Sequence, residues 1–152
     1  MSWGETEDAR AICEQLLKIT GDALLAGDFD TFAACFHLPH FMSTTDAKAS
    51  IETTTALKQL FEKTIDSHRR KRVTDVIRKC DVCNFRSPTH IGSTHTTHLM
   101  SGSQRIAEPF PSFSTIELID GVWKITSSHY ALDKTLAIGA ALHAHNATTA
   151  DK

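Results

Sequence analysis

The chain lacks several features that would place it in a class of proteins directly. No apolar run approaches the roughly 18 residues of a membrane-spanning helix, and the polar, acidic N-terminus is unlike a signal peptide. Neither sign of charge dominates, because the net charge is only -2, so the molecule as a whole does not attract nucleic acid or an anionic membrane. These absences predict a cytoplasmic protein with no membrane partner and no nucleic-acid partner.

Signatures of two common chemistries are also missing. The sequence holds no G-x-S-x-G motif and no glycine-rich phosphate loop. Its one dense basic run, residues 68–72, falls at the end of a predicted helix, where cations are favoured. That run has no interleaved aromatic side chains on which bases could stack. These classes of function therefore have no local support in the sequence.

Histidine and cysteine are frequent enough, at nine and four residues, to raise the question of a metal site. Pairs three residues apart are His37 with His40, His95 with His98, and Cys80 with Cys83. On a strand, two residues three positions apart have side chains on opposite faces, so none of these pairs is expected to bind one metal ion together. The cysteines are instead typical of small buried side chains in a reduced compartment. We expect neither a metal nor a cofactor.

What the sequence does contain is the composition of one globular domain. Its hydrophobic fraction of 41% argues against disorder, and 152 residues suffice for one core. Apolar residues recur at helical spacing up to Gly27, which ends the first predicted helix. Asp28 or Asp30 begins a second helix that ends at Pro39, and a third helix covers about 52–67.

The period of the apolar residues then changes from helical to two, as in strands. Strands are predicted at 40–45, 73–85, 90–100 and on both sides of the Asp120-Gly121 pair, which fits a tight hairpin turn. Residues 46–50 are predicted to form a loop. Pro109 and Pro111 exclude a central strand before that hairpin. Helices followed by antiparallel strands predict an α+β domain over residues 1–132. The tail, 133–152, is predicted to form a short helix and then to fray.

Two segments of the chain carry a resemblance to a known family: residues 24–36, LLAGDFDTFAACF, and residues 120–125, DGVWKI. The first resembles the first helix, Gly-Asp break and second helix of the nuclear transport factor 2-like superfamily, and the second resembles the D-G-x-W-x-I hairpin of the same superfamily. The resemblance implies a cone-shaped half-barrel, in which a strongly bent, mainly antiparallel sheet wraps around three N-terminal helices. It also implies a small apolar organic ligand in the cone and a homodimer formed through the outer sheet face. The superfamily includes ketosteroid isomerases, scytalone dehydratases and pure binding proteins, so the fold does not decide the activity.

Strand alternation predicts which side chains face the inside of such a cone. A two-residue turn pairs Leu118 with Trp123 and Ser114 with Ser127, and it places His129 on the same inner face. The single tyrosine, Tyr130, then lies on the outer face. In the preceding pair of strands, the predicted inner face comprises Val76, Cys80, Val82, Ile91, His95 and Leu99, with Cys80 opposite His95.

The candidate catalytic residues are three histidines, His40, His95 and His129, with Asp46 as a neighbouring carboxylate. Imidazole titrates near neutral pH and can exchange protons with a substrate, which favours a lyase, an isomerase or a hydrolase. The candidate ligand-binding residues are Phe32, Met42, Thr44, Ser114, Trp123 and Ser127.

The catalytic residues of related enzymes do not transfer intact to this chain. Thr44 stands near the position of the aspartate base of ketosteroid isomerases and cannot act as a base, and Tyr130 is predicted outside the cone. Each candidate histidine has an alternative role as a hydrogen-bonded core residue. The alternative function is a non-catalytic ligand-binding or protein-interaction module, or an accessory subunit of a larger enzyme.

Overall fold

The computed structural model describes residues 7–132, 141–142 and 145–147. Between residues 7 and 132, three helices and seven strands follow one another along the chain. The helices are α1 (Glu7–Ala26), α2 (Phe29–Ala33) and α3 (Thr54–Arg70). The strands are β1 (Phe36–Ser43), β2 (Lys48–Ile51), β3 (Asp75–Ser87), β4 (His90–Ser101), β5 (Gln104–Arg105), β6 (Phe110–Ile119) and β7 (Val122–Tyr130).

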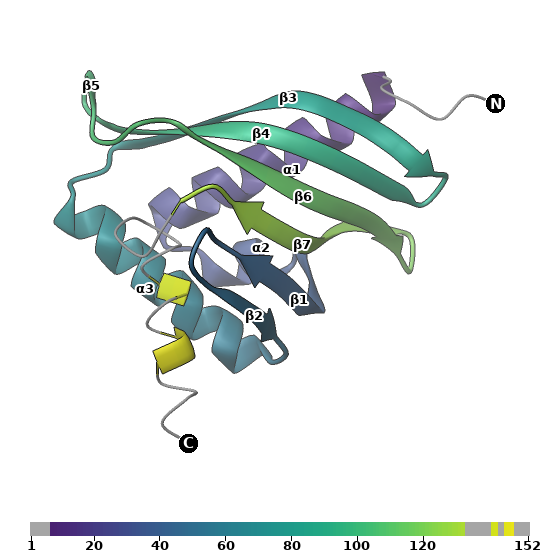
Figure 1. Ribbon diagram of the computed structural model, residues 1–152, viewed down its shortest axis with the longest axis horizontal. Coiled ribbons are helices and arrows are strands. Elements are labelled where there is room, and N and C mark those ends of the chain that lie inside the picture. Colours follow the sequence, from purple (N-terminus) through teal and green to yellow (C-terminus); the bar gives the residue numbers. More distant parts are fainter. Residues whose placement is uncertain (1–6, 133–140, 143–144, 148–152) are drawn as a thin grey trace.

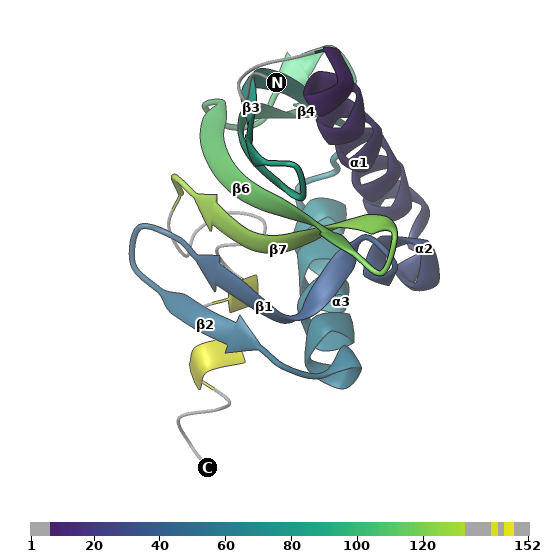
Figure 2. The ribbon, with the colours of Figure 1, turned by 90° about the vertical axis from the view of Figure 1, so that its right-hand side faces the viewer.

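The strands form one sheet in the order β2-β1-β7-β6-β4-β3, with β5 attached to β4. The pairing of β1 with β7 is parallel, and the other described pairings are antiparallel. The sheet bends around α1, α2 and α3, which lie on its concave side (Figure 1, Figure 2). The predicted α+β class and the predicted half-barrel of a bent, mainly antiparallel sheet are therefore confirmed.

Short local signals set the ends of the helices. Gly27 has a φ angle of 72°, which glycine adopts at little cost, and α1 ends just before it. Asp28 caps α2, because its carboxylate accepts a hydrogen bond from the backbone N–H of Thr31. Thr53 caps α3 in the same way, through its hydroxyl oxygen and the N–H of Ala56. The predicted stop at Gly27 and the predicted cap at Asp28 are confirmed.

Three predictions that involved proline or a short segment are wrong. Helix α2 ends at Ala33, and Pro39 lies within β1 where its pairing with β7 is interrupted, a place where a missing N–H donor is tolerated. Pro111 is likewise accommodated near the start of β6. Residues 48–50, predicted as a loop, belong to β2, which is only four residues long and shows too short an alternation to be recognised.

A β-bulge in β7 changes which of its side chains face the helices. Ile116 pairs with Ile125 but Thr115 pairs with Ser127, so Thr126 is an extra residue on β7. The register predicted for the tip of the hairpin, where Leu118 pairs with Trp123, is confirmed. Beyond the bulge, every side chain of β7 faces the side opposite to the predicted one.

A second bulge lies in β3, where Asp81 is the extra residue. The predicted pairing of Cys80 with His95 precedes this bulge and is confirmed. Beyond it, Cys83 is fully buried, whereas Val82, predicted inside, is 46% exposed. Cys80 and Cys83 therefore both face the core, contrary to the prediction that a step of three separates them.

The core lies between the concave face of the sheet and the helices. Phe32 packs against Phe61 with ring centroids 4.8 Å apart, which joins α2 to α3. Ala141 and Leu142 are buried in the same core, while most of the tail with its predicted helix and frayed end lies outside the described residues. Among the helices that the structure describes, none is long and apolar enough to cross a membrane.

Candidate functional site

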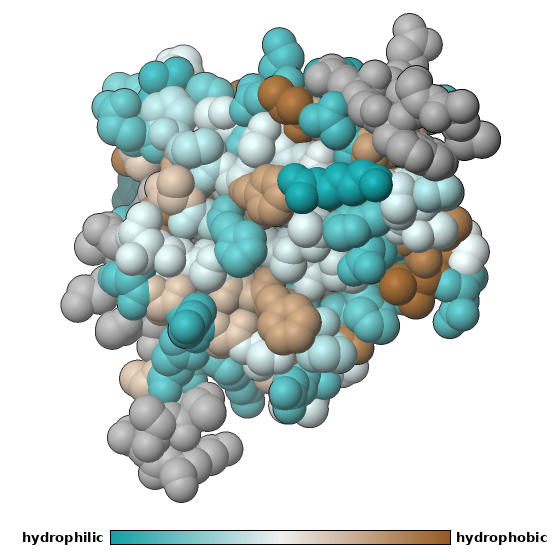
Figure 3. Space-filling model, turned by 45° about the vertical axis from the view of Figure 1, so that its right-hand side comes forward, coloured by the Kyte–Doolittle hydropathy of each residue, from teal (hydrophilic) through white to brown (hydrophobic). Residues whose placement is uncertain are grey.

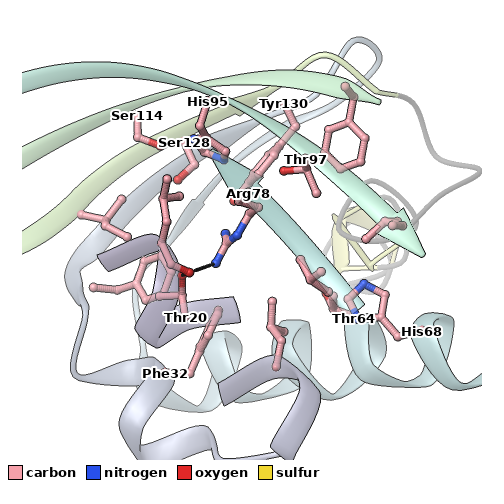
Figure 4. A pocket seen from close by; sticks show the side chains of 17 residues that line it. Thr20, Phe32, Thr64, His68, Arg78, His95, Thr97, Ser114, Ser128 and Tyr130 are labelled. Atoms are coloured by element: carbon pink, nitrogen blue, oxygen red, sulfur yellow. Dashed lines mark hydrogen bonds between the residues drawn. The ribbon is translucent and has the colours of Figure 1, made fainter. Parts of the chain in front are cut away.

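A cavity of about 70 Å³ lies inside the cone, between the sheet and the helices (Figure 4). One water molecule needs roughly 10–15 Å³ of such space, so the cavity has room for several water-sized groups. Its helix side is formed by Leu17, Thr20, Leu24, Phe32, Thr64 and His68. Its sheet side carries polar groups from four strands, namely Arg78, His95, Thr97, Ser114, Ser128 and Tyr130.

Arg78 places a positive charge in this cavity. Its Nη2 atom donates hydrogen bonds to the carbonyl oxygen of Leu17, at 2.7 Å, and to the hydroxyl of Thr20, both on α1 (Figure 4). Among the described residues, its Nε atom has no hydrogen-bond partner, and no carboxylate lies within salt-bridge distance of its guanidinium. Burial lowers the pKa of Arg78, but an arginine stays protonated at neutral pH. The charge of Asp22 also acts on Arg78, but the Asp22 carboxylate is exposed and paired with Lys18 at 3.1 Å. The cavity therefore holds a cation without an ion-pair partner among the described residues.

Gly21 gives the guanidinium of Arg78 room against α1. A Cβ atom at position 21 would lie 3.3 Å from Nη2 of Arg78, which is a tight contact. Glycine inside a helix costs roughly 1 kcal/mol relative to alanine. The close approach of Arg78 is a physical reason for glycine at this position.

Two buried imidazoles share the cavity with Arg78. His95 on β4 is 3% exposed, and neither of its ring nitrogens has a hydrogen-bond partner among the described residues. Burial and the nearby charge of Arg78 lower the pKa of His95 to about 3. The same two causes lower the pKa of His68, at the end of α3, to about 4. Both rings are therefore neutral at pH 7, and a neutral imidazole has one donor and one acceptor. Both nitrogens of His95 and Nδ1 of His68 are buried without a hydrogen-bond partner among the described residues.

Hydroxyl groups complete the polar part of the cavity. Ser114, Ser128 and Tyr130 project from β6 and β7 beside His95 (Figure 4). Burial raises the pKa of Tyr130, so its phenol is protonated at neutral pH and can donate a hydrogen bond. The cavity thus combines one cation, two neutral imidazoles and several hydroxyl groups with an apolar wall.

Three of the residues predicted for the site line this cavity. They are His95, Phe32 and Ser114, which come from β4, α2 and β6. Their catalytic and ligand-binding roles stay predictions. The other predicted residues lie elsewhere, for two different reasons.

The bulge at Thr126 is the first reason. It turns His129 and Ser127 to the outer face of the sheet, and it turns Ser128 and Tyr130 inward. His129 is exposed there and hydrogen-bonds through Nδ1 to the hydroxyl of Ser43. The prediction that His129 follows the inner face is therefore wrong, and so is the outer position predicted for Tyr130.

The second reason is that several of the predicted residues lie in the packed core or in a loop, away from the cavity. His40 is fully buried, its Nδ1 lies 3.3 Å from the carbonyl oxygen of Ile125, and burial lowers its pKa to about 4. Met42 belongs to the packed core, and Trp123 is partly buried against it. Thr44 and Asp46 lie in the loop after β1, where the Thr44 hydroxyl donates to the Asp46 carboxylate at 3.1 Å. None of these five residues lines the cavity, so the predicted cluster of three histidines and a carboxylate does not form there.

The sulfur atoms do not build a second site. Cys13, Cys35, Cys80 and Cys83 are buried as free thiols. Burial raises the pKa of Cys13 to about 12 and that of Cys80 to about 11, so both are protonated and poorly nucleophilic at pH 7. Within the described ranges, no group of three or more His, Cys, Asp or Glu side chains is arranged to hold a metal ion.

Sequence reasoning missed Arg78, Tyr130 and His68 as cavity residues. The inward position of Arg78 could have been predicted, because residues 76, 78 and 80 share one face of a strand and both Val76 and Cys80 were predicted to face inward. Tyr130 was not, because no residue in β7 signals the bulge that turns it inward. His68 is the first residue of the basic run 68–72, and its burial depends on how α3 packs under the sheet.

No protein-family profile matches this sequence, and no curated protein matches it. Solved structures do match over most of the chain. A domain of unknown function with a cystatin-like fold from Nostoc punctiforme shares 14% identity at a TM-score of 0.68, over 87% of this chain and 82% of that chain. An NTF2-like protein of unknown function from Shewanella oneidensis shares 14% identity at a TM-score of 0.60, over 80% and 98% of the two chains.

The protein has an NTF2-like fold. A candidate dehydratase of the NTF2-like family from Streptomyces avermitilis is also similar, with 11% identity and a TM-score of 0.62, over 84% of this chain and 99% of that chain. The resemblance inferred from the two sequence segments is thus confirmed for the fold. Identities this low carry no activity from one NTF2-like protein to another, so the cavity has to supply the argument for function.

Proposed function

We propose that the protein binds a small organic molecule inside the cone. The observation that carries the proposal is the state of His95, whose two ring nitrogens are buried in the cavity without a hydrogen-bond partner in the described part of the chain. A buried polar group without a partner costs roughly 1–3 kcal/mol, and native structures rarely retain one. A ligand that hydrogen-bonds to His95 removes this cost. Leu24 and Phe32 offer apolar contacts to the rest of such a ligand.

Filling the cavity from the sheet tests the proposal. Thr97→Phe places an aromatic ring in the cavity, and Thr96→Phe places the same ring on the outer face of the same strand as a matched control. Small acids, amides, ketones and alcohols are tested by saturation-transfer NMR. We expect some to bind the wild-type protein and Thr96→Phe, and to bind Thr97→Phe at least tenfold more weakly. Equal binding to all three proteins, or no binding to the wild-type protein, would refute the proposal.

A second candidate function, acid–base catalysis, is favoured by the neighbours of His95. Its neutral ring can accept a proton, and the Tyr130 phenol and the Arg78 guanidinium in the same cavity can stabilise negative charge on a substrate oxygen. Among lyases, isomerases and hydrolases, this combination best suits a reaction that removes a proton next to a carbonyl group. An imidazole with a pKa of about 3 is a weak base until a ligand stabilises its charged form.

Proton exchange with solvent tests this second candidate. Butanone is incubated with the protein in deuterated water, and loss of its C–H signals is followed by proton NMR. We expect the wild-type protein and His98→Gln to accelerate exchange and His95→Gln to abolish the acceleration, since His98 lies on the other face of β4. Without acceleration by the wild-type protein, binding without turnover remains the proposed function.

We also propose a homodimer formed through the outer face of the sheet. Phe41 on β1 and Ile77 on β3 expose 55% and 52% of their surface on this face. Apolar side chains are interspersed with polar ones on the face of the molecule shown in Figure 3. Aromatic side chains such as that of Phe41 are enriched at interfaces between subunits relative to the rest of the surface. The cytoplasmic location stays a prediction of the sequence.

A further inference from the structure

We infer that the ligand of the cavity is a small organic carboxylate, held by the guanidinium of Arg78. The inference rests on the proposed function, that the cavity binds a small molecule, and it adds the chemical class of that molecule.

The unbalanced charge of the cavity is the first argument. Arg78 carries a full positive charge, and the residues that line the cavity include no aspartate and no glutamate among those the structure describes. His68 and His95 stand beside it as neutral rings and contribute no counter-charge. An unpaired charge inside a protein is costly, and an anionic ligand compensates it, whereas a neutral ligand does not and a cation adds to it.

The way Arg78 is held is the second argument. Its Nη2 atom is fixed to α1 through Leu17 and Thr20, whereas Nε has no partner among the described residues. A guanidinium has five N–H donors, so this one is fixed in orientation and still has donors to offer. Its planar array of N–H groups matches the two oxygens of a carboxylate, and charge-assisted hydrogen bonds of this kind are about twice as strong as neutral ones.

The rest of the cavity argues for a small monoanion rather than a phosphate. One guanidinium supplies one positive charge, and the neighbouring donors, Ser114, Ser128 and Tyr130, are neutral hydroxyl groups. Leu24 and Phe32 form part of an apolar wall that suits a short hydrocarbon portion. The cavity of about 70 Å³ limits that portion to a few carbon atoms unless side chains move.

Pairs of molecules that differ only in charge test the inference. Propionate and isobutyrate are compared by calorimetry with propionamide and isobutyramide, at pH 7, and inorganic phosphate is included as a non-carboxylate anion. We expect each acid to bind the wild-type protein at least tenfold more tightly than its amide, and phosphate to bind more weakly than either acid. This comparison needs no variant, so it decides the question even if substitutions at Arg78 disturb folding.

Variants then locate the effect. Arg78→Gln should abolish the preference for the acids, and Arg78→Lys should retain part of it, because lysine keeps the charge and loses the planar fork. Arg86→Gln is the matched control, with the same change of charge on the same strand, because the Arg86 guanidinium lies 5.3 Å from the centre of the Phe113 ring on the outer face. Circular dichroism and thermal unfolding check that each variant is folded.

The possible results separate the two proposals. Amides that bind as tightly as acids, and that Thr97→Phe excludes, would overturn the carboxylate inference and leave small-molecule binding intact. Phosphate binding more tightly than both acids would also overturn it. A preference for acids that survives Arg78→Gln would remove the role of Arg78. No binding by any of these compounds would count against both proposals.

Discussion

At the scale of single residues, three histidines are buried as neutral rings: His40, His68 and His95. Burial is the main cause, and it lowers their pKa values to about 4, 4 and 3. In the unfolded chain each would titrate near 6.5. As the pH falls below 6.5, the unfolded chain therefore takes up protons that the folded protein does not.

The expected consequence is a loss of stability in mild acid. The contribution of each ring is fully present above pH 6.5 and decreases as the pH falls, towards about 4 for His40 and His68 and towards about 3 for His95. At 1.36 kcal/mol for each pKa unit, each should lose about 2 kcal/mol of unfolding free energy by pH 5. The difference between the unfolding free energies measured in urea at pH 7.5 and pH 5 gives the summed contribution of the three rings.

Single substitutions identify which rings cause the effect. His40→Gln should reduce the difference in unfolding free energy between the two pH values by one ring's share, whatever it does to stability at pH 7.5. His98→Gln, whose ring lies on the outer face of β4, is the matched control. Equal stability of the wild-type protein at both pH values would contradict burial of these rings as neutral groups.

At the scale of elements, the N-cap residue Thr53 stabilises the start of α3. The hydroxyl oxygen of Thr53 accepts a hydrogen bond of 3.0 Å from the N–H of Ala56. We expect Thr53→Ala to lower the unfolding free energy by about 1 kcal/mol, because an N–H at the helix start loses its partner. Thr55→Ala, an exposed position in the first turn, should be neutral or slightly stabilising. Chemical denaturation of the two variants measures the difference, and equal values would show that the cap does not contribute.

Elements with a local signal could be predicted from the sequence, and elements whose form depends on a neighbouring strand could not. Gly27, Asp28 and the Asp120-Gly121 turn act through their own backbone preferences, so the helices and the last hairpin were recognised. The bulges at Asp81 and Thr126 depend on the partner strand. Arg10 illustrates this dependence, because it donates to the carbonyl oxygens of Cys80 and Asp81 from another element, 70 and 71 residues away in the chain.

At the scale of the whole molecule, the described part of the tail packs into the same core as the helices and the sheet. Leu142 is fully buried together with residues of the helices and the sheet, and Asn146 donates to the carbonyl oxygen of Lys48 on β2. We expect Leu142→Ala to lower the unfolding free energy by about 2–5 kcal/mol, as for other buried leucines. Asn146→Ala should cost less than 1 kcal/mol, because its side chain is at the surface. Thermal unfolding compares the two, and a neutral Leu142→Ala would show that the tail does not stabilise the domain.

The proposed dimer also belongs to this scale. The double substitution Phe41→Lys and Ile77→Lys introduces two charges on the outer face, and it should convert a dimer into a monomer in light scattering after gel filtration. Leu25→Lys, at a position 43% exposed at the end of α1, is the control and should not change the mass. A wild-type protein that is monomeric at high concentration would exclude the dimer.

The overall fold was predictable from the sequence because many weak signals agree on it, whereas the site depends on a few side chains. One extra residue in β7 moved His129 out of the predicted site and left the cone unchanged. His95, which lies on a regular stretch of β4, was predicted on the correct face. Site predictions of this kind are therefore most secure for strands without bulges.

The bulge at Thr126 has a consequence for how this protein could change over generations. If a substitution beside the bulge let Thr126 enter the ladder opposite Thr115, every later residue of β7 would move one place along β6. The phenol of Tyr130 would then leave the cavity, and the imidazole of His129 would enter it. A gene with this fold can thus acquire different cavity chemistry by a change at the bulge, with every residue of the cavity retained in the sequence.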